Sequence, residues 1–289
     1  MMDSLSRRFP AHVVRWYAGT LIAKPYAIPD FLVGVRGQNP FCPVGGSNPV
    51  ETGRFKILTD PEDVRKGVSS SLQLYGTYDP ELSWVVEQLV DSESTVIDVG
   101  ANIGWYTLLA AVVARRVVAL EPEPRNFTLL SRSVALNGLH NVELRQEVVS
   151  DREGEVDLYL SDTNKGGHSI VWKGPSSVKV HSTTLEQIVG ELGILSIDLL
   201  KIDAESAEPR ILRGFTKGLE SGLAKYIILE FSPMVWGKDR DLLKRVFELY
   251  RVYEFRRPIP LLTRRKSIDE LPKLKQVMLV MEHRGLSGS

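Results

Sequence analysis

The sequence predicts an α/β fold built on a doubly wound, mostly parallel sheet. Short runs rich in β-branched residues alternate with longer segments of helical periodicity from residue 79 onward. A glycine-rich turn follows one of these runs and leads directly into a helix. Strands and helices that alternate in this way form βαβ units, and their right-handed crossovers place helices on both faces of one sheet.

Local signals define the individual elements. The helix at 79–89 has Asp79 at its capping position and Pro80 at its first position, and the helix at 124–137 ends at Asn137 and Gly138. The runs at 156–160 and 178–181 are expected to form a β-hairpin insertion. The other expected strands are 54–58, 95–99, 117–120, 142–145, 199–202, 226–230, 252–255 and 276–281, and the other helices are 105–115, 184–191, 209–219 and 239–249.

Two parts of the chain are expected. Residues 1–70 form an N-terminal extension, with an amphipathic helix at 11–22 and a stretch rich in proline and glycine at 24–53, and residues 71–289 form the main domain. We expect the helix to dock on the protein's own domain, with contact to a membrane surface or a partner as the alternative. No apolar run approaches the roughly 18–20 residues that span a bilayer.

The overall charge does not favour a nucleic-acid partner. Lys and Arg total 36, as do Asp and Glu, so the formal net charge is zero and no DNA partner is expected. The single cysteine, Cys42, excludes an internal disulfide and favours a reducing compartment, so we expect a cytoplasmic protein. One local basic cluster is either a phosphate-binding surface or a solvated loop: Arg256, Arg257, Arg264, Arg265 and Lys266.

The turn after the strand at 95–99 is the strongest functional signal. Residues 96–104 have the sequence VIDVGANIG, and glycines in such a turn let a ligand approach the backbone closely. Asp98 disfavours a pyrophosphate and suits a cofactor with a sulfonium charge. Glu121, at the end of the next strand, is placed to accept hydrogen bonds from both ribose hydroxyls. The alternative is a bare tight turn with an acid at the surface.

The same stretch resembles a known family. VIDVGANIGWYTLLAA, followed by ALEPEPRNFTLL, is similar to the FkbM family of class I methyltransferases. Further matches occur in the family's order over about 74–232, and they are LYGTYDPEL, VVSDREGEVDL, NKGGHSIV, TTLEQI, IDLLKIDAESAE and IILEF. The resemblance implies a Rossmann-like fold with S-adenosylmethionine as cofactor. It implies these cofactor-binding residues: Asp98, Gly100, Asn102, Ile103, Gly104, Glu121, Pro122, Asn126 and Glu147.

The end of the strand at 199–202 carries the candidate catalytic residues. Lys201 lies inside the strand and needs a partner if it is buried, and Asp203 and Glu205 follow it. A hydroxyl becomes a good nucleophile only when a base or a metal ion helps to remove its proton. Asp203 is the first candidate for this base, Glu205 the second, and His168, in a loop at 164–169, the third.

Alternative interpretations of these residues remain open. Lys201 and Asp203 could be a purely structural ion pair, and His168 an exposed loop residue. Asp203, Glu205 and Glu230 could instead hold a divalent cation, although we expect no metal. The family's D-V-E-G-A-E has serine in place of glycine here, at Ser206, which leaves the geometry of this turn open.

The expected function is methyl transfer from S-adenosylmethionine to a hydroxyl oxygen. The resemblance implies that the acceptor is a sugar, a glycan or another small metabolite. One alternative is an RNA- or nitrogen-directed methyltransferase, and another is a cofactor-binding module without catalytic activity.

Overall fold

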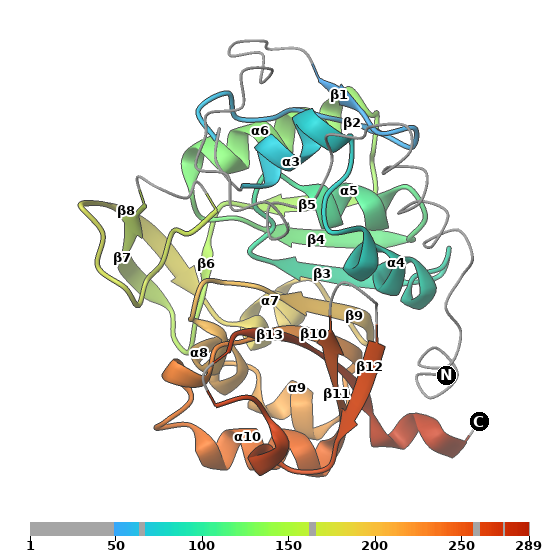
Figure 1. Cartoon of the computed structure of the whole chain (residues 1–289), viewed down its shortest axis with the longest axis vertical. Helices are drawn as coiled ribbons and strands as arrows, with labels where there is room; N and C mark the ends of the chain where they lie inside the picture. The colour runs from blue at the N-terminus through green and yellow to red at the C-terminus, as the bar shows by residue number, and fades with distance from the viewer. Residues whose placement is uncertain (1–48, 64–66, 162–165, 257–260, 274, 289) are drawn as a thin grey trace, which may run out of the picture.

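The computed structural model describes residues 49–63, 67–161, 166–256, 261–273 and 275–288 (Figure 1). The predicted helix at 11–22 and Cys42 lie outside the described residues. The described part of the extension contains two short paired strands, β1 (Val50–Glu51) and β2 (Lys56–Ile57). The helix α3 (Val68–Tyr75) crosses the predicted domain boundary at residue 70, and that boundary stays a prediction.

The main sheet has eight strands in the order β12-β11-β13-β10-β9-β3-β4-β5. Four of its seven strand pairings are parallel, so the predicted α/β fold with a mostly parallel sheet is confirmed. The parallel strands are β3 (Thr95–Val99), β4 (Arg116–Leu120), β5 (Val142–Arg145), β9 (Ile197–Ile202) and β10 (Ala224–Phe231). The antiparallel strands are β11 (Tyr250–Arg256), β12 (Leu261–Arg265) and β13 (Val277–His283).

The order of the parallel strands reverses in the middle of the sheet. From β3 the chain continues outward through β4 and β5, and it then returns to β9 and β10 on the other side of β3. Ligands of doubly wound sheets bind outside the carboxyl ends of the strands at such a reversal. The ends of β3 and β9 are therefore where a site is expected.

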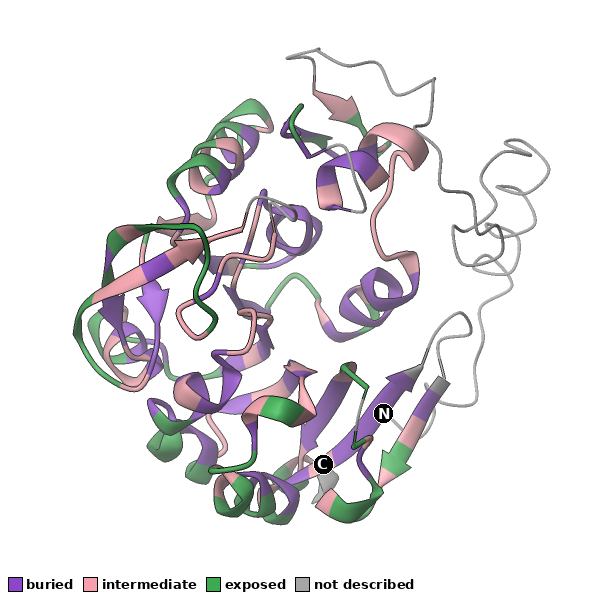
Figure 2. Ribbon diagram, turned by 60° about the vertical axis from the view of Figure 1, so that its left-hand side comes forward, coloured by how far each residue is buried: buried purple, intermediate pink, exposed green. Residues whose placement is uncertain are grey.

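Helices cover both faces of the sheet (Figures 1 and 2). Val96 and Leu199 pack toward one face, whereas their neighbours Ile97 and Leu200 pack toward the other, because strand side chains alternate. The first face carries α3, α4 (Pro80–Leu89), α5 (Trp105–Ala111) and α6 (Pro124–Leu136), and the second carries α7 (Leu185–Glu191), α8 (Glu208–Arg213), α9 (Thr216–Glu220) and α10 (Arg240–Leu249). All seven residues of α5 are buried, as its apolar sequence predicted.

The predicted hairpin insertion is present as part of a larger unit. β7 (Gly154–Leu160) and β8 (Ser176–Thr183) pair antiparallel. A third strand, β6 (Val148–Val149), pairs parallel with β8 and was not predicted. Val148, Leu158 and Val180 form a small apolar cluster between these strands, which gives the insertion a core of its own.

Three sequence predictions about local structure are wrong. The single helix expected at 209–219 is two helices, which are separated at Gly214 and Phe215, and a Cβ on Gly214 would lie 2.3 Å from the carbonyl oxygen of Ser150. Asp79 does not cap α4 through its side chain, which instead accepts a hydrogen bond from the Tyr106 hydroxyl at 2.9 Å. Part of the expected basic loop is β12, where Arg265 forms an ion pair with a glutamate on β11.

Two further features concern possible surfaces. Arg264 and Lys266 are exposed, while Arg257 and the side chain of Arg256 lie outside what the structure describes. Within the described ranges, none of the helices combines the length and the apolar character needed to cross a membrane.

Candidate active site

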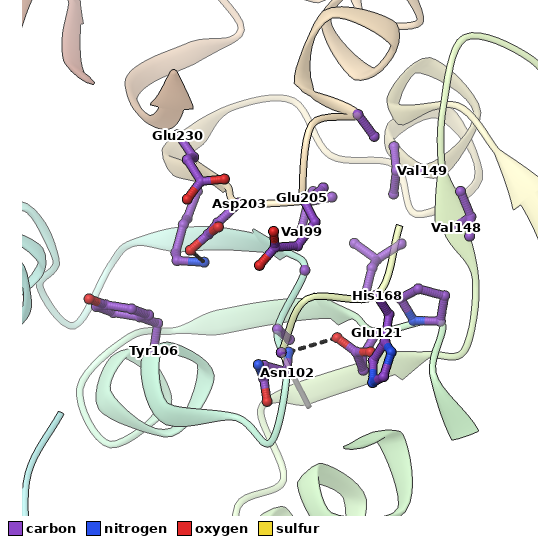
Figure 3. Close-up of a pocket in the computed structure, with 18 of the residues that line it drawn as sticks. Val99, Asn102, Tyr106, Glu121, Val148, Val149, His168, Asp203, Glu205 and Glu230 are labelled. Carbon is purple, nitrogen blue, oxygen red and sulfur yellow. Dashed lines mark hydrogen bonds and ion pairs between the residues drawn. The ribbon is translucent and has the colours of Figure 1, made fainter. Parts of the chain in front are cut away.

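A cavity of about 190 Å³ opens at the carboxyl ends of β3 and β9, where the strand order reverses (Figure 3). The turn after each of these strands lines it, together with the end of β4, the start of α3 and the segment between β7 and β8. All four candidate catalytic residues line the cavity, namely Lys201, Asp203, Glu205 and His168. The lining also includes five of the predicted cofactor-binding residues: Gly100, Asn102, Glu121, Pro122 and Glu147.

The glycine turn brings the ends of β3 and β9 into close contact. Gly100 has a φ of 77°, and a Cβ on it would lie 1.9 Å from the carbonyl oxygen of Asp203. Gly104 has a φ of 99°, and its Cβ would lie 2.5 Å from Cδ1 of Leu130 on α6. Only glycine meets both requirements at these two positions, because other residues rarely adopt this backbone region and their Cβ would need the missing space.

Glu121 is fixed at the end of β4 by two backbone amides. Its Oε2 accepts a hydrogen bond from the N–H of Asn102 at 2.7 Å, and its Oε1 accepts one from the N–H of Glu123 at 3.0 Å. Burial raises the pKa of Glu121 to about 7, against the opposing effect of the two amides. Each carboxylate oxygen has a second lone pair, so Glu121 can also accept hydrogen bonds from hydroxyl groups of a ligand in the cavity.

The other four predicted cofactor-binding residues do not line the cavity. Ile103 is buried in the apolar core, and Gly104 is the residue before α5. The backbone N–H of Asn126 donates to Glu123, which caps α6 and was not singled out from the sequence. Asp98 is 1% exposed and lies beneath the cavity, where its Oδ2 accepts a hydrogen bond from the Thr107 hydroxyl at 2.7 Å. The expectation that Asp98 faces the cofactor is therefore corrected to a supporting position.

Lys201 connects this buried aspartate to the cavity. Its Nζ lies 3.4 Å from Oδ1 of Asp98 and 3.4 Å from Oδ2 of Asp203, and 5.0 Å from the ring centre of Tyr106. Burial disfavours the charged ammonium, but the attraction of Asp203 and Asp98 outweighs burial, so the pKa of Lys201 lies above its ordinary value. Lys201 therefore stays protonated and is not a base.

Several carboxyl groups surround the end of β9. Burial, and then the charge of Asp203, raises the pKa of Glu205 to about 7. Burial also raises the pKa of Glu208 to about 7. Burial, and then the charge of Asp203, holds the pKa of Glu230 well above its ordinary value. Asp203 differs from these three because it has a direct counter-ion in Lys201. It is therefore the best placed of the four to be a charged base.

His168 lies in the segment between β7 and β8, at 166–175, which contributes to the lining of the cavity. Its Nδ1 accepts a hydrogen bond from the backbone N–H of Ser161 at 3.1 Å. A neutral imidazole that accepts at Nδ1 carries its proton on Nε2, so it has no second nitrogen that accepts a proton. Figure 3 draws His168 toward Glu121, and it draws Asp203 and Glu230 together on another side of the cavity. This geometry favours Asp203 over His168 as the base.

The charge of the lining indicates which ligands fit. Among the lining residues that the structure describes, Lys201 is the sole lysine or arginine, and two carboxylates already neutralise it. Five acids line the same cavity: Glu121, Glu147, Asp203, Glu205 and Glu230. Such a lining fits a ligand with positive charges, such as a sulfonium and an ammonium group, better than it fits a pyrophosphate. No set of three His, Cys, Asp or Glu side chains in the described ranges is arranged to hold a metal ion.

Two aromatic residues of the cavity were not predicted. Tyr78 and Tyr106 line it, and their rings meet edge to face with centres 6.4 Å apart. Tyr78 lies in the LYGTYDPEL stretch, which offered a signal for it. Tyr106 belongs to the apolar helix α5, and its periodicity suggested only a core residue.

The fold and the site together define a class. A sheet whose order reverses between β3 and β9, with a glycine turn after β3 and an acid at the end of β4, is the Rossmann-like fold of class I methyltransferases. Residues 98–257 match the family model of the methyltransferase FkbM domain, and this chain belongs to that family.

The chain is similar to parts of proteins from several organisms, two of which are named as methyltransferases. It is 26% identical to the hexuronic acid methyltransferase AglP of Haloferax volcanii, over 52% of this chain and 60% of that protein. It is 22% identical to the 2-O-methyltransferase NoeI of Sinorhizobium fredii, over 59% of this chain and 76% of that protein. The matched part covers only 10% of the antimetabolite synthetase AmbE of Pseudomonas aeruginosa, at 30% identity over 56% of this chain.

Coverage of several relatives is partial. The chain spans about 60% of the length of AglP, and 58% of methyltransferase 1 of Beauveria bassiana. Among solved structures, the FkbM methyltransferase of Methylobacillus flagellatus aligns with a TM-score of 0.44 at 12% identity, over 66% of this chain and 44% of that one.

Proposed function

We propose that this protein is an S-adenosylmethionine-dependent methyltransferase that methylates a hydroxyl oxygen of a sugar, a glycan or another small metabolite. The observation that carries this proposal is one acid-lined cavity that joins the glycine turn, Glu121 and the Asp203 turn. Family membership supports the reaction type. The names of AglP and NoeI, a hexuronic acid methyltransferase and a 2-O-methyltransferase, support oxygen as the methylated atom.

The cofactor would occupy the side of the cavity formed by β3, β4 and β5. Gly100 and Asn102 would line its amino-acid part, and Glu121 would accept the ribose hydroxyls. Glu147 would accept a hydrogen bond from the adenine amino group, since it lines the cavity and its Oε2 has an ion-pair contact to Arg145 at 3.8 Å but accepts no hydrogen bond from the described residues. When bound, S-adenosylmethionine supplies an electrophilic methyl group on a sulfonium.

Asp203 would then act on the acceptor. It removes the hydroxyl proton as the acceptor oxygen forms its bond to the methyl carbon and the bond from that carbon to sulfur breaks. The products are a methyl ether and S-adenosylhomocysteine, and Asp203 later releases the proton to water. Lys201 holds the Asp203 carboxylate in place at 3.4 Å, and Glu205 is the second candidate for the same task.

Calorimetric titration with S-adenosylhomocysteine tests the cofactor site. We expect binding by the wild-type protein and at least about tenfold weaker binding by Glu121→Ala, because hydrogen bonds to a charged acceptor contribute about 1.5–3 kcal/mol each. Glu87→Ala, which removes a half-buried acid that is paired with Arg54 and does not line the cavity, is the control and should bind normally. Absence of binding by the wild-type protein at millimolar ligand would overturn the proposal.

Labelled cofactor, incubated with fractionated cell glycans and small molecules, tests the reaction. We expect a labelled methyl ether, and a loss of about a hundredfold or more in rate for Asp203→Asn with little change in S-adenosylhomocysteine affinity. Asp157→Asn, at a half-buried position of β7 that does not line the cavity, is the control. Full activity of Asp203→Asn would instead favour a nitrogen acceptor, which needs no strong base. The cytoplasmic location expected from the sequence stays a prediction.

A further inference from the structure

The turn after β9 contains two consecutive residues in a backbone region that non-glycine residues rarely adopt. Glu205 has a φ of 47° and Ser206 a φ of 80°. Such conformations persist only where the surroundings hold them. The peptide group between these two residues is therefore the part of the turn that most needs external contacts.

Both ends of that peptide group are bound. Its carbonyl oxygen, on Glu205, accepts a hydrogen bond from the hydroxyl of Ser169 at 2.7 Å. Its N–H, on Ser206, donates to Oε1 of Glu208 at 3.2 Å, and the same oxygen accepts the N–H of Ala204 at 3.0 Å. Glu208 is fully buried, and Ser169 is 3% exposed. A flip of the peptide would break both contacts, so Ser169 and Glu208 together prevent it.

Ser169 also belongs to the segment between β7 and β8, several residues of which line the cavity. Its hydroxyl oxygen accepts hydrogen bonds from the backbone N–H groups of Val171 at 3.0 Å and Trp172 at 3.3 Å. Its backbone pairs in both directions with Tyr159 on β7, at 2.9 and 3.1 Å. The one donor and both acceptor positions of this hydroxyl are therefore in use. Its neighbours His168 and Ile170 line the cavity.

We propose that Ser169 is a positioning residue. It fixes the Glu205–Ser206 peptide, so that the position of the Glu205 carboxyl depends on the segment between β7 and β8. This inference rests on the proposed function for its consequence, because Glu205 lines the cavity beside the candidate base. Loss of the Ser169 hydroxyl frees the peptide carbonyl. The Glu205 carboxyl then samples positions in which it cannot contact the acceptor.

The chain contains a matched control in the same insertion. Ser182, on β8, is also fully buried, and its hydroxyl also donates to a backbone carbonyl, that of Arg152, at 2.9 Å. Ser182 does not line the cavity. Ser182→Ala and Ser169→Ala therefore each remove a hydroxyl that donates to a backbone carbonyl, and only the Ser169 hydroxyl donates to Glu205. The Ser169 hydroxyl also accepts two backbone N–H groups, so its loss affects residues 171 and 172 as well.

Hydrogen exchange on the full chain with S-adenosylhomocysteine tests the contact without an activity assay. In Ser169→Ala we expect faster exchange in peptides that cover 169–172 and also 203–208, whereas Ser182→Ala leaves both unchanged. Unaltered exchange at 203–208 in Ser169→Ala would overturn the proposal. Equal acceleration in both variants would also overturn it, because that result describes a general loss of stability.

A double-mutant cycle tests the consequence for methyl transfer, with the acceptor fraction found above. We expect Ser169→Ala to lower kcat about tenfold with less than a twofold change in the KM for the cofactor, and to have almost no further effect in a Glu205→Gln background. If the double variant instead shows the product of the two single reductions in kcat, the two residues act independently and the proposal is contradicted. If Glu205→Gln alone has full activity, the proposed link from Ser169 to the reaction is wrong. The proposed function is not affected by that result, because it is tested separately by cofactor binding and methyl transfer of the wild-type protein.

Discussion

Replacing Lys201 by methionine tests the buried charges beneath the cavity. The side chains of Lys201 and Asp98 are 4% and 2% exposed, and methionine has a similar length without the charge. The change leaves Asp98 with the Thr107 hydroxyl and no counter-ion. Removal of one partner of a buried ion pair costs about 3–5 kcal/mol, because the remaining charge is isolated from water.

This cost is large enough to measure by thermal unfolding. For a chain of this size about 1 kcal/mol corresponds to roughly 2–4 °C, so we expect Tm to fall by roughly 6–20 °C. Lys225→Met is the matched control, because Lys225 pairs with Asp198 between the same kind of parallel strands but is 42% exposed. Exposed pairs contribute about 0–1 kcal/mol, so this control should lower Tm by no more than about 4 °C.

A second substitution separates charge from packing. Asp98→Asn in the Lys201→Met background removes the isolated charge and keeps the side-chain shape, so we expect it to restore part of the lost stability. If the two lysine variants unfold at the same temperature, the buried pair has no special role. If Asp98→Asn lowers stability further, the isolated charge is not the cause of the loss.

Two other predictions concern the turn after β9. Ser206→Gly should raise the free energy of unfolding in urea by about 1 kcal/mol, because glycine adopts the φ of 80° without the cost that a residue with a Cβ has there. Ser221→Gly, at a φ of −77°, is the control and should lower the free energy of unfolding. A loss of stability in Ser206→Gly together with a gain in Ser221→Gly would refute the argument. Glu208 has its pKa raised from 4.5 to about 7, so its contribution to stability is complete below pH 4.5 and is lost as the pH rises through 7. Between pH 4.5 and 8 this loss is up to about 3 kcal/mol in the free energy of unfolding, and the Glu208→Gln variant should lack it. If the free energies of unfolding of the two proteins change in parallel with pH, Glu208 is not the group responsible.

The strands at the centre of the sheet could be predicted from the sequence because their signals are local. β3 has the predicted bounds, since its apolar run ends directly in a glycine turn. The contact of Gly214 with the Ser150 carbonyl could not be predicted in this way, because the two residues are far apart in the sequence.

The candidate site was predictable by position and less so by direction. Each residue at the end of a parallel strand was expected near the ligand, and Glu121 and Asp203 do line the cavity. Asp98 shows the limit of this approach, because it lies within β3 and its side chain is directed to the same face as that of Val96. Strand alternation would have placed it toward α5, where Thr107 binds it.

The contacts between β3 and β9 explain why the two halves of the cavity can act together. Where the two strands end, Gly100 is packed against the Asp203 carbonyl, and the Asp203 N–H donates to the carbonyl of Val99 at 3.1 Å. The ammonium of Lys201 adds a side-chain connection, because it lies 3.4 Å from Asp98 of β3 and 3.4 Å from Asp203 of the turn after β9. Methyl transfer needs the acceptor oxygen about 3 Å from the methyl carbon and in line with the leaving sulfur. Because both strand ends are joined by these backbone and side-chain contacts, the side that would bind the cofactor and the side that carries the candidate base are fixed relative to each other.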